Sequence, residues 1–98
     1  MTKEEFLEVY KKYHEDEHSE FESVENQLSL RPDLHAFILL DKIVPGATDI
    51  IISAEHDQIW IDVPVDDLAK NATEEQILEL IRAGIILDEE SESLFMFV

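Results

Sequence analysis

Hydrophobic and polar residues alternate most regularly in the stretch DIIISAEHDQIWIDV, which runs from Asp49 to Val63. Because successive side chains of a strand point to opposite faces, this alternation predicts two strands joined by a loop over residues 55–58. One face would be apolar, with Ala54 opposite Ile59, Ile52 opposite Ile61 and Ile50 opposite Val63. The other face would place Ser53 opposite Trp60 and Ile51 opposite Asp62. A slip of one residue would mix these faces, so the pattern specifies the register.

An amphipathic helix is predicted over residues 2–28, where apolar side chains recur every three or four positions. Thr2 and Glu5 have the spacing of an N-terminal capping box. The middle of this stretch is so polar that the helix can bend or break near Ser19, although neither glycine nor proline forces a break. The rest of its surface is mostly Glu, Asp, Lys and His, which predicts a solvated, charged element.

A second helix is predicted over residues 34–44, which are apolar on nearly every side. A helix of this kind is buried, so it is expected at the centre of the core. Ser29 or Asp33 would be its N-cap, and Pro45-Gly46 would end it.

A third helix is predicted from Thr73 onward, after a connector over residues 64–71 with room for one helical turn. Thr73 and Gln76 have the spacing of a capping box, and Gly84 is placed to end the helix in the left-handed conformation.

Two short apolar runs, over residues 85–87 and 94–98, predict the last strands. Leu94–Val98 is apolar on both faces, which is typical of a strand covered on both sides. We therefore expect it in the centre of the sheet, with the helix over 2–28 on one face and the helix over 34–44 on the other. The alternative is an edge strand that pairs with a second copy.

The order α-α-β-β-α-β-β predicts a single small α+β domain over residues 1–98. Its N-terminal part, residues 1–28, would be the acidic amphipathic helix, and residues 33–98 would form the α-ββ-α-ββ core. The sheet would be mostly antiparallel, with three or four strands packed against helices.

Composition narrows the class of protein further. The 98 residues are 45% hydrophobic, enough for a core, and contain no cysteine. The lack of cysteine excludes a disulfide framework and a thiolate zinc site and is typical of a reducing compartment. No apolar run approaches the roughly 20 residues of a membrane helix. We expect a cytoplasmic protein, a monomer or homodimer, with no cofactor and no membrane partner.

The net charge is the outlying property. Asp and Glu number 24 against seven Lys and Arg, which gives a formal charge of −17. Such a surface repels nucleic acid and attracts basic proteins at an enhanced rate. The alternative is that the charge serves solubility alone.

From Asp33 onward the chain resembles small uncharacterised proteins of tailed phages, most clearly in AEHDQIWIDV, LIRAGI and ESLFMFV. The resemblance implies a phage origin, and therefore the cytoplasm of a bacterial host as the place of action. It brings no reaction and no site residues, and the first thirty residues lie outside it.

The sequence HEDEH at residues 14–18 matches the zinc motif H-E-x-x-H, in which His14 and His18 would bind the metal and Glu15 would be a general base. The extension of the metzincin motif is missing, because Phe21 and Val24 stand where Gly and His are required. We interpret the motif as a solvated helix face, with no metal and no catalytic residue, and keep His14 and His18 as weak candidate ligands.

Trp60 is the other residue of interest, because the predicted register places it opposite the aliphatic face, near Asp62. Either it anchors an interface as an aromatic patch rimmed with acid, or the first helix covers it. The sequence leaves both open.

Three functions follow from these features. The first is a non-enzymatic inhibitor that imitates DNA and binds a basic nuclease of a restriction or CRISPR system. The residues expected to bind this partner are Glu15, Asp16, Glu17, Glu20, Glu22, Glu25, Trp60 and Asp62. The second is an assembly module that uses the aromatic patch. The third is a zinc hydrolase that uses HEDEH.

Overall fold

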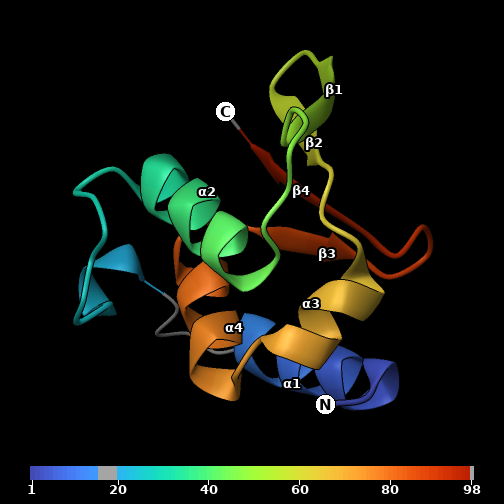
Figure 1. The fold of residues 1–98 in the computed structure, drawn as a ribbon. Coiled ribbons are helices and arrows are strands. Elements are labelled where there is room, and N and C mark those ends of the chain that lie inside the picture. The colour runs from blue at the N-terminus through green and yellow to red at the C-terminus, as the bar shows by residue number, and fades with distance from the viewer. Residues whose placement is uncertain (16–19, 98) are drawn as a thin grey trace.

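The computed structural model describes residues 1–15 and 20–97. These residues form a four-stranded antiparallel sheet and four α-helices, which confirms the predicted α+β class (Figure 1). The elements are α1 (Lys3–His14), the 3-10 turn η1 (Phe21–Ser23), α2 (Pro32–Ile43), β1 (Ile51–Glu55), β2 (Gln58–Ile61), α3 (Val65–Asn71), α4 (Glu74–Arg82), β3 (Ile86–Asp88) and β4 (Ser93–Phe97). The connector predicted over residues 64–71 is therefore largely helical.

The first helix is much shorter than predicted. The capping box forms as expected, since Thr2 accepts from the Glu5 backbone and the Glu5 side chain accepts from the Thr2 backbone. These bonds also lower the pKa of Glu5, because they stabilise its charged form. The helix nevertheless ends at His14, and residues 21–31 form η1 and a loop, so the prediction of one helix to residue 28 was wrong.

The second helix starts where proline allows it. Pro32 occupies the first turn, as predicted, but the N-cap is Arg31, which makes no side-chain capping bond. Ser29 instead accepts a hydrogen bond from the Arg31 backbone, and Asp33 accepts one from Leu34. Both N-cap predictions were therefore wrong, because Ser29 binds the Arg31 amide before the helix and Asp33 binds the Leu34 amide from within the first turn.

The helix predicted from Thr73 onward is confirmed as α4. Thr73 and Gln76 make the capping box, and Gly84 follows the helix with φ of 98°. A side chain rarely adopts this left-handed conformation, which explains why glycine ends the helix. The buried face of α4 consists of Ile77, Leu80 and Ile81.

The sheet has the strand order β1-β2-β4-β3, so the predicted central position of the last strand is correct. Next to the His56–Asp57 turn the predicted register holds, with Ala54 paired to Ile59 and Ser53 to Trp60. A bulge between Ile51 and Ser53 then shifts the pairing by one residue. Ile51 therefore pairs with Ile61, and Ile50 accepts from the Asp62 backbone, so the predicted pairs of Ile52, Ile51 and Ile50 were wrong.

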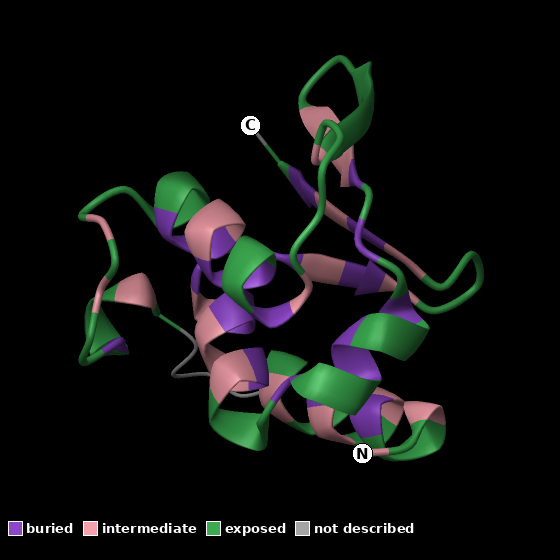
Figure 2. Cartoon of the chain, viewed as in Figure 1, coloured by how far each residue is buried: buried purple, intermediate pink, exposed green. Residues whose placement is uncertain are grey.

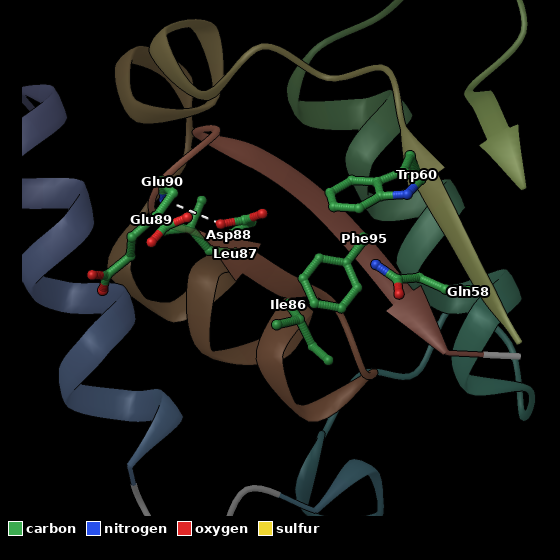
Figure 3. A pocket seen from close by; sticks show the side chains of 8 residues that line it. All are labelled: Gln58, Trp60, Ile86, Leu87, Asp88, Glu89, Glu90 and Phe95. Carbon is green, nitrogen blue, oxygen red and sulfur yellow. Dashed lines mark hydrogen bonds between the residues drawn. The ribbon is translucent and has the colours of Figure 1, made fainter. Parts of the chain in front are cut away.

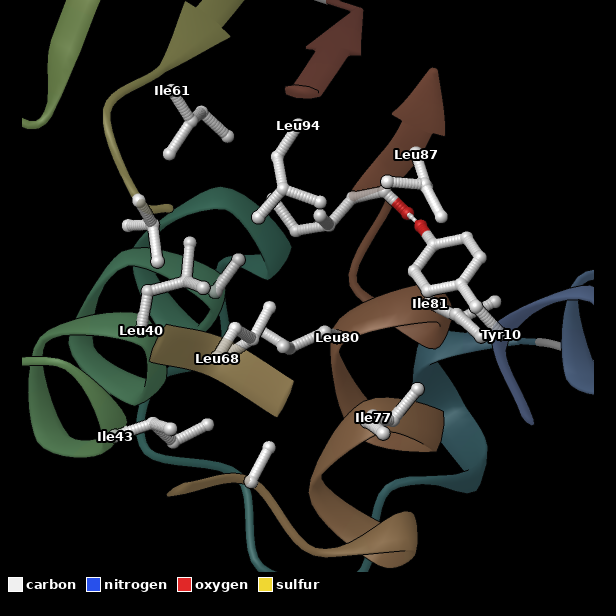
Figure 4. Close-up of a cluster of buried hydrophobic side chains, with 14 of the residues drawn as sticks. Tyr10, Leu40, Ile43, Ile61, Leu68, Ile77, Leu80, Ile81, Leu87 and Leu94 are labelled. Atoms are coloured by element: carbon white, nitrogen blue, oxygen red, sulfur yellow. Dashed lines mark hydrogen bonds between the residues drawn. The ribbon is translucent and has the colours of Figure 1, made fainter. Parts of the chain in front are cut away.

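All helices lie on one side of the sheet (Figure 1). Leu87, Leu94 and Ile61 form a cross-strand row on that side, and all three are buried in the core (Figure 4). The helices contribute the buried side chains Phe6, Tyr10, Leu40, Leu68, Ile77 and Leu80. The expectation that helices cover both faces was wrong, because α1 packs against α3 and α4 instead of the second face.

Strand β1 is one of the two edge strands of the sheet, and it extends beyond the helices (Figures 1 and 2). Each of its five residues is exposed, including Ile52 with 61% of its surface accessible. On the predicted apolar face of the hairpin, the first fully buried residue after the turn is thus Ile61, at the end of β2.

Candidate functional site: the open face of the sheet

A row of large side chains crosses the face of the sheet that the helices leave open. Trp60 on β2 pairs with Phe95 on β4, and Phe95 pairs with Ile86 on β3. The Trp60 and Phe95 rings have centroids 5.1 Å apart, and the rings of Phe95 and Phe97 are 5.7 Å apart. Trp60, Phe95 and Ile86 are half-buried, while Phe97 is 58% exposed. Of the two predicted alternatives for Trp60, an accessible aromatic patch or cover by the first helix, the structure has the accessible patch.

The row forms one wall of an open depression of about 540 Å³ (Figure 3). In Figure 3, Trp60 and Phe95 project from neighbouring strands toward the same side, and Asp88, Glu89 and Glu90 lie at the other end of the depression from Ile86. The lining residues are Gln58, Trp60, Ile86, Leu87, Asp88, Glu89, Glu90 and Phe95. The depression therefore combines an aromatic wall with a carboxylate rim.

The carboxylate rim is held by the tight turn between β3 and β4. Asp88 accepts a hydrogen bond of 3.1 Å from the Glu90 backbone, and Glu92 has φ of 54°. Lys3 forms an ion pair with Glu92, and this hydrogen-bonded contact raises the pKa of Lys3. Within residues 1–15 and 20–97, no lysine or arginine forms such a pair with Asp88, Glu89 or Glu90.

The carboxylates predicted to bind a partner do not share one helix. Glu15 caps the end of α1, while Glu20, Glu22 and Glu25 lie on η1 and the adjoining loop, all exposed. Asp16 and Glu17 lie outside the described residues. Among the described residues, α1 ends at His14 and the next element is η1, so Glu20, Glu22 and Glu25 do not lie on α1. Whether the four described carboxylates contact a partner stays a prediction.

Asp62 lies just beyond β2, on the far side of the hairpin from the turn. It is exposed and lines a small cavity of about 50 Å³ together with Asp41 and Asp49. Ile61 pairs with Leu94, and Leu94 pairs with Leu87, so Asp62 follows Trp60 toward the end of the sheet at which the acidic turn lies.

The HEDEH motif is described only in part. His14 is exposed at the end of α1 and its ring stacks on Tyr10, whereas His18 lies outside the described residues. Among the residues that the structure does describe, no three His, Asp or Glu side chains are grouped so that they could hold a metal ion.

The loop that carries Glu22 and Glu25 is anchored by a buried histidine that the sequence reasoning missed. His35 on α2 is fully buried, accepts a 3.0 Å hydrogen bond from the Leu28 backbone through Nδ1, and contacts the ring of Phe21 edge-on. Sequence reasoning also missed Phe95, Ile86 and the acidic turn as parts of one site. The alternation of residues 94–97 was the signal, since it placed Phe95 and Phe97 on one face.

No family model, no curated protein and no solved structure matches this chain. Within the part of the chain that is described, no helix is long and apolar enough to cross a bilayer.

We expect the melting temperature to rise with sodium chloride between about 0.01 M and 0.3 M, as the Debye length falls from ~30 Å to below ~10 Å. The domain measures 31 × 29 × 24 Å, so its like charges repel one another across the whole molecule at low salt. The two ion pairs found among the described residues, Lys3–Glu92 and Lys12–Glu74, are partly or largely exposed and oppose this trend only weakly. A flat or falling melting temperature by scanning calorimetry would contradict the expectation.

Proposed function

We propose that the protein is a non-enzymatic module that binds a basic, nucleic-acid-binding protein through the open sheet face and competes with its nucleic acid. The observation that supports this proposal is the aromatic row Trp60–Phe95–Ile86 beside the acidic turn Asp88–Glu90. Aromatic side chains that are accessible at the centre of a patch, with a polar rim, are typical of interface hot spots.

The charge of the molecule defines the partner. A net charge of −17 disfavours a second copy of the chain and any nucleic acid, and it steers basic proteins toward the surface. A basic groove that binds nucleic acid presents the complementary charge. This protein would therefore occupy that groove in place of the nucleic acid. A nuclease of a bacterial defence system is the form of this partner that the phage-like sequence favours.

This form of recognition differs from imitation of DNA along a helix. The attraction comes from charge distributed over the whole surface, whereas the specific contact would be made by the aromatic row. Glu15, Glu20, Glu22 and Glu25 would then add to the rate of association and little to the lifetime of the complex, because rim charges act mainly on encounter.

We expect Trp60→Ala to weaken binding of such a partner by about 30-fold, since removal of a hot-spot aromatic typically costs about 2 kcal/mol. The immobilised chain would be incubated with a bacterial lysate at two salt concentrations and then eluted with duplex DNA. The proteins to purify are those that the wild-type matrix retains and DNA releases, but that the Trp60→Ala matrix does not retain. Their affinities for the wild-type and Trp60→Ala chains would then be measured by calorimetry.

Leu30→Ala is the matched control, because Leu30 is 88% exposed and lies in the loop before α2, away from the open face. It should retain the same proteins as the wild-type chain. Equal retention by the wild-type and Trp60→Ala chains would contradict a role for the aromatic row. Retained proteins that DNA cannot release would instead favour the second candidate, an assembly module, which the accessible aromatic row also supports.

A further inference from the structure

We infer that the depression over Trp60 and Phe95 receives arginine side chains of the partner rather than lysine side chains. This inference rests on the proposed function and names the chemical group that the open face recognises. Three features carry it: two tilted aromatic rings, unpaired carboxylates at one rim, and the lack of any basic residue in the lining.

The aromatic wall offers a π surface to a cation. The Trp60 and Phe95 rings have an interplanar angle of 46°, so they form a shallow V rather than a flat stack. A cation within about 6 Å of such rings is attracted to their faces. The chain does not fill this position itself: none of the eight lining residues is basic, and Lys12 instead lies 5.0 Å from the centre of the Tyr13 ring.

The rim offers hydrogen-bond acceptors in the same depression. Asp88 uses one oxygen for the Glu90 backbone and keeps the other, while Glu89 and Glu90 are exposed. Glu92, the fourth acid of this turn, is already neutralised by Lys3 and does not line the depression. Within this turn, the carboxylates without a basic partner among the described residues are thus Asp88, Glu89 and Glu90, the three that line the depression.

These features together favour arginine over lysine. A guanidinium group is planar, weakly hydrated and able to stack on an aromatic ring while its N–H groups bind a carboxylate in pairs. An ammonium group is compact and strongly hydrated, so it would lose more solvation on the aromatic wall. The volume of about 540 Å³ exceeds the needs of one side chain and lies in the range of pockets for larger ligands, which favours a segment carrying more than one arginine.

The test compares two synthetic peptides of equal charge, one with four Arg-Gly-Ser repeats and one with four Lys-Gly-Ser repeats. Trp60 is the single tryptophan of the chain, so its fluorescence reports directly on the depression. We expect both peptides to bind the full chain, with the arginine peptide about tenfold tighter and a larger change in Trp60 emission. Equal affinities would overturn the inference and leave the proposed function standing, whereas no binding of either peptide would contradict both.

Two variants separate the aromatic wall from the rim. Phe95→Leu keeps the bulk but removes the π face, and it should reduce the arginine preference to below about threefold. Glu89→Gln with Glu90→Gln, both in an exposed turn, should weaken the arginine peptide by about tenfold. The matched control, Glu75→Gln with Glu79→Gln, makes the same change in net charge in another cavity and should weaken it by less than about threefold. An arginine preference that survives Phe95→Leu, or an arginine affinity that Glu89→Gln with Glu90→Gln leaves unchanged, would overturn the inference.

Discussion

A chain that lacks residues 95–98 will not fold. Strand β4 lies between β2 and β3, so the loss of residues 95–97 removes most of its pairing with both neighbours and takes the buried side chain of Met96 out of the core. Burial of one Met or Leu side chain contributes roughly 2–5 kcal/mol by truncation, and a small domain has only about 5–15 kcal/mol in total. We expect no cooperative thermal transition by circular dichroism for the truncated chain.

Two point variants keep the length of the chain and make this prediction stricter. Leu94→Ala should lower the free energy of unfolding by about 2–5 kcal/mol, because Leu94 is fully buried. Phe97→Ala should change it by less than about 1 kcal/mol, because Phe97 is 58% exposed on the open face. A truncated chain that melts at the temperature of the full chain would show that β4 is not part of the core.

The free energy of unfolding will fall above pH 10, and Tyr10 will account for most of the fall. Tyr10 is 4% exposed, and its hydroxyl donates a hydrogen bond to the Ile85 backbone (Figure 4). Burial raises the pKa of Tyr10 far above its usual range, and a backbone hydrogen bond with Leu87 opposes the rise only in part. The folded state therefore keeps the phenol neutral at a pH where the unfolded chain has lost the proton.

The sign follows from this difference. Below the unfolded pKa of about 10, both states hold the proton and stability is complete. Above it, stability is lost at up to ~1.4 kcal/mol per pH unit until the folded pKa is reached. Urea titrations between pH 8 and pH 11.5 at constant ionic strength would measure the slope.

Tyr10→Phe should be less stable at pH 7 by about 1–3 kcal/mol, because a buried carbonyl loses its partner, but should show a much smaller alkaline slope. Tyr13→Phe is the matched control, since the Tyr13 hydroxyl contacts Glu74 at the surface. This substitution should leave the alkaline slope unchanged. If Tyr10→Phe retains the full slope, another group controls alkaline unfolding.

The elements that could be predicted from the sequence are those fixed by local chemistry. The capping box of α4 and the pairing of Ala54 with Ile59 depend on residues a few positions apart, and both formed as expected. The end of α1 depends on distant residues instead. Phe21 leaves the helical stripe to contact His35 on α2, a contact that periodicity along the chain could not indicate.

The exposure of Trp60 could not be predicted for a related reason. The sequence indicated that α1 needs a surface to pack against, but it did not identify α3 as a helix. Val65, Leu68 and Ala69 of α3 are buried, and with α4 they provide the surface that α1 needs. Once α1 is placed there, the second face of the sheet has no helix left to cover it.

The exposed strand β1 has a consequence for how the domain opens. Because its five residues are exposed and it pairs only with β2, its detachment would expose little additional apolar surface. Its amide hydrogens should therefore exchange with solvent deuterium through local fluctuations, at free energies far below that of global unfolding, while those of β4 exchange only when the whole domain opens. The hairpin tip at His56–Asp57 would accordingly accept an inserted peptide tag. Any strain from the tag would act on the hairpin, which opens independently of the rest of the domain.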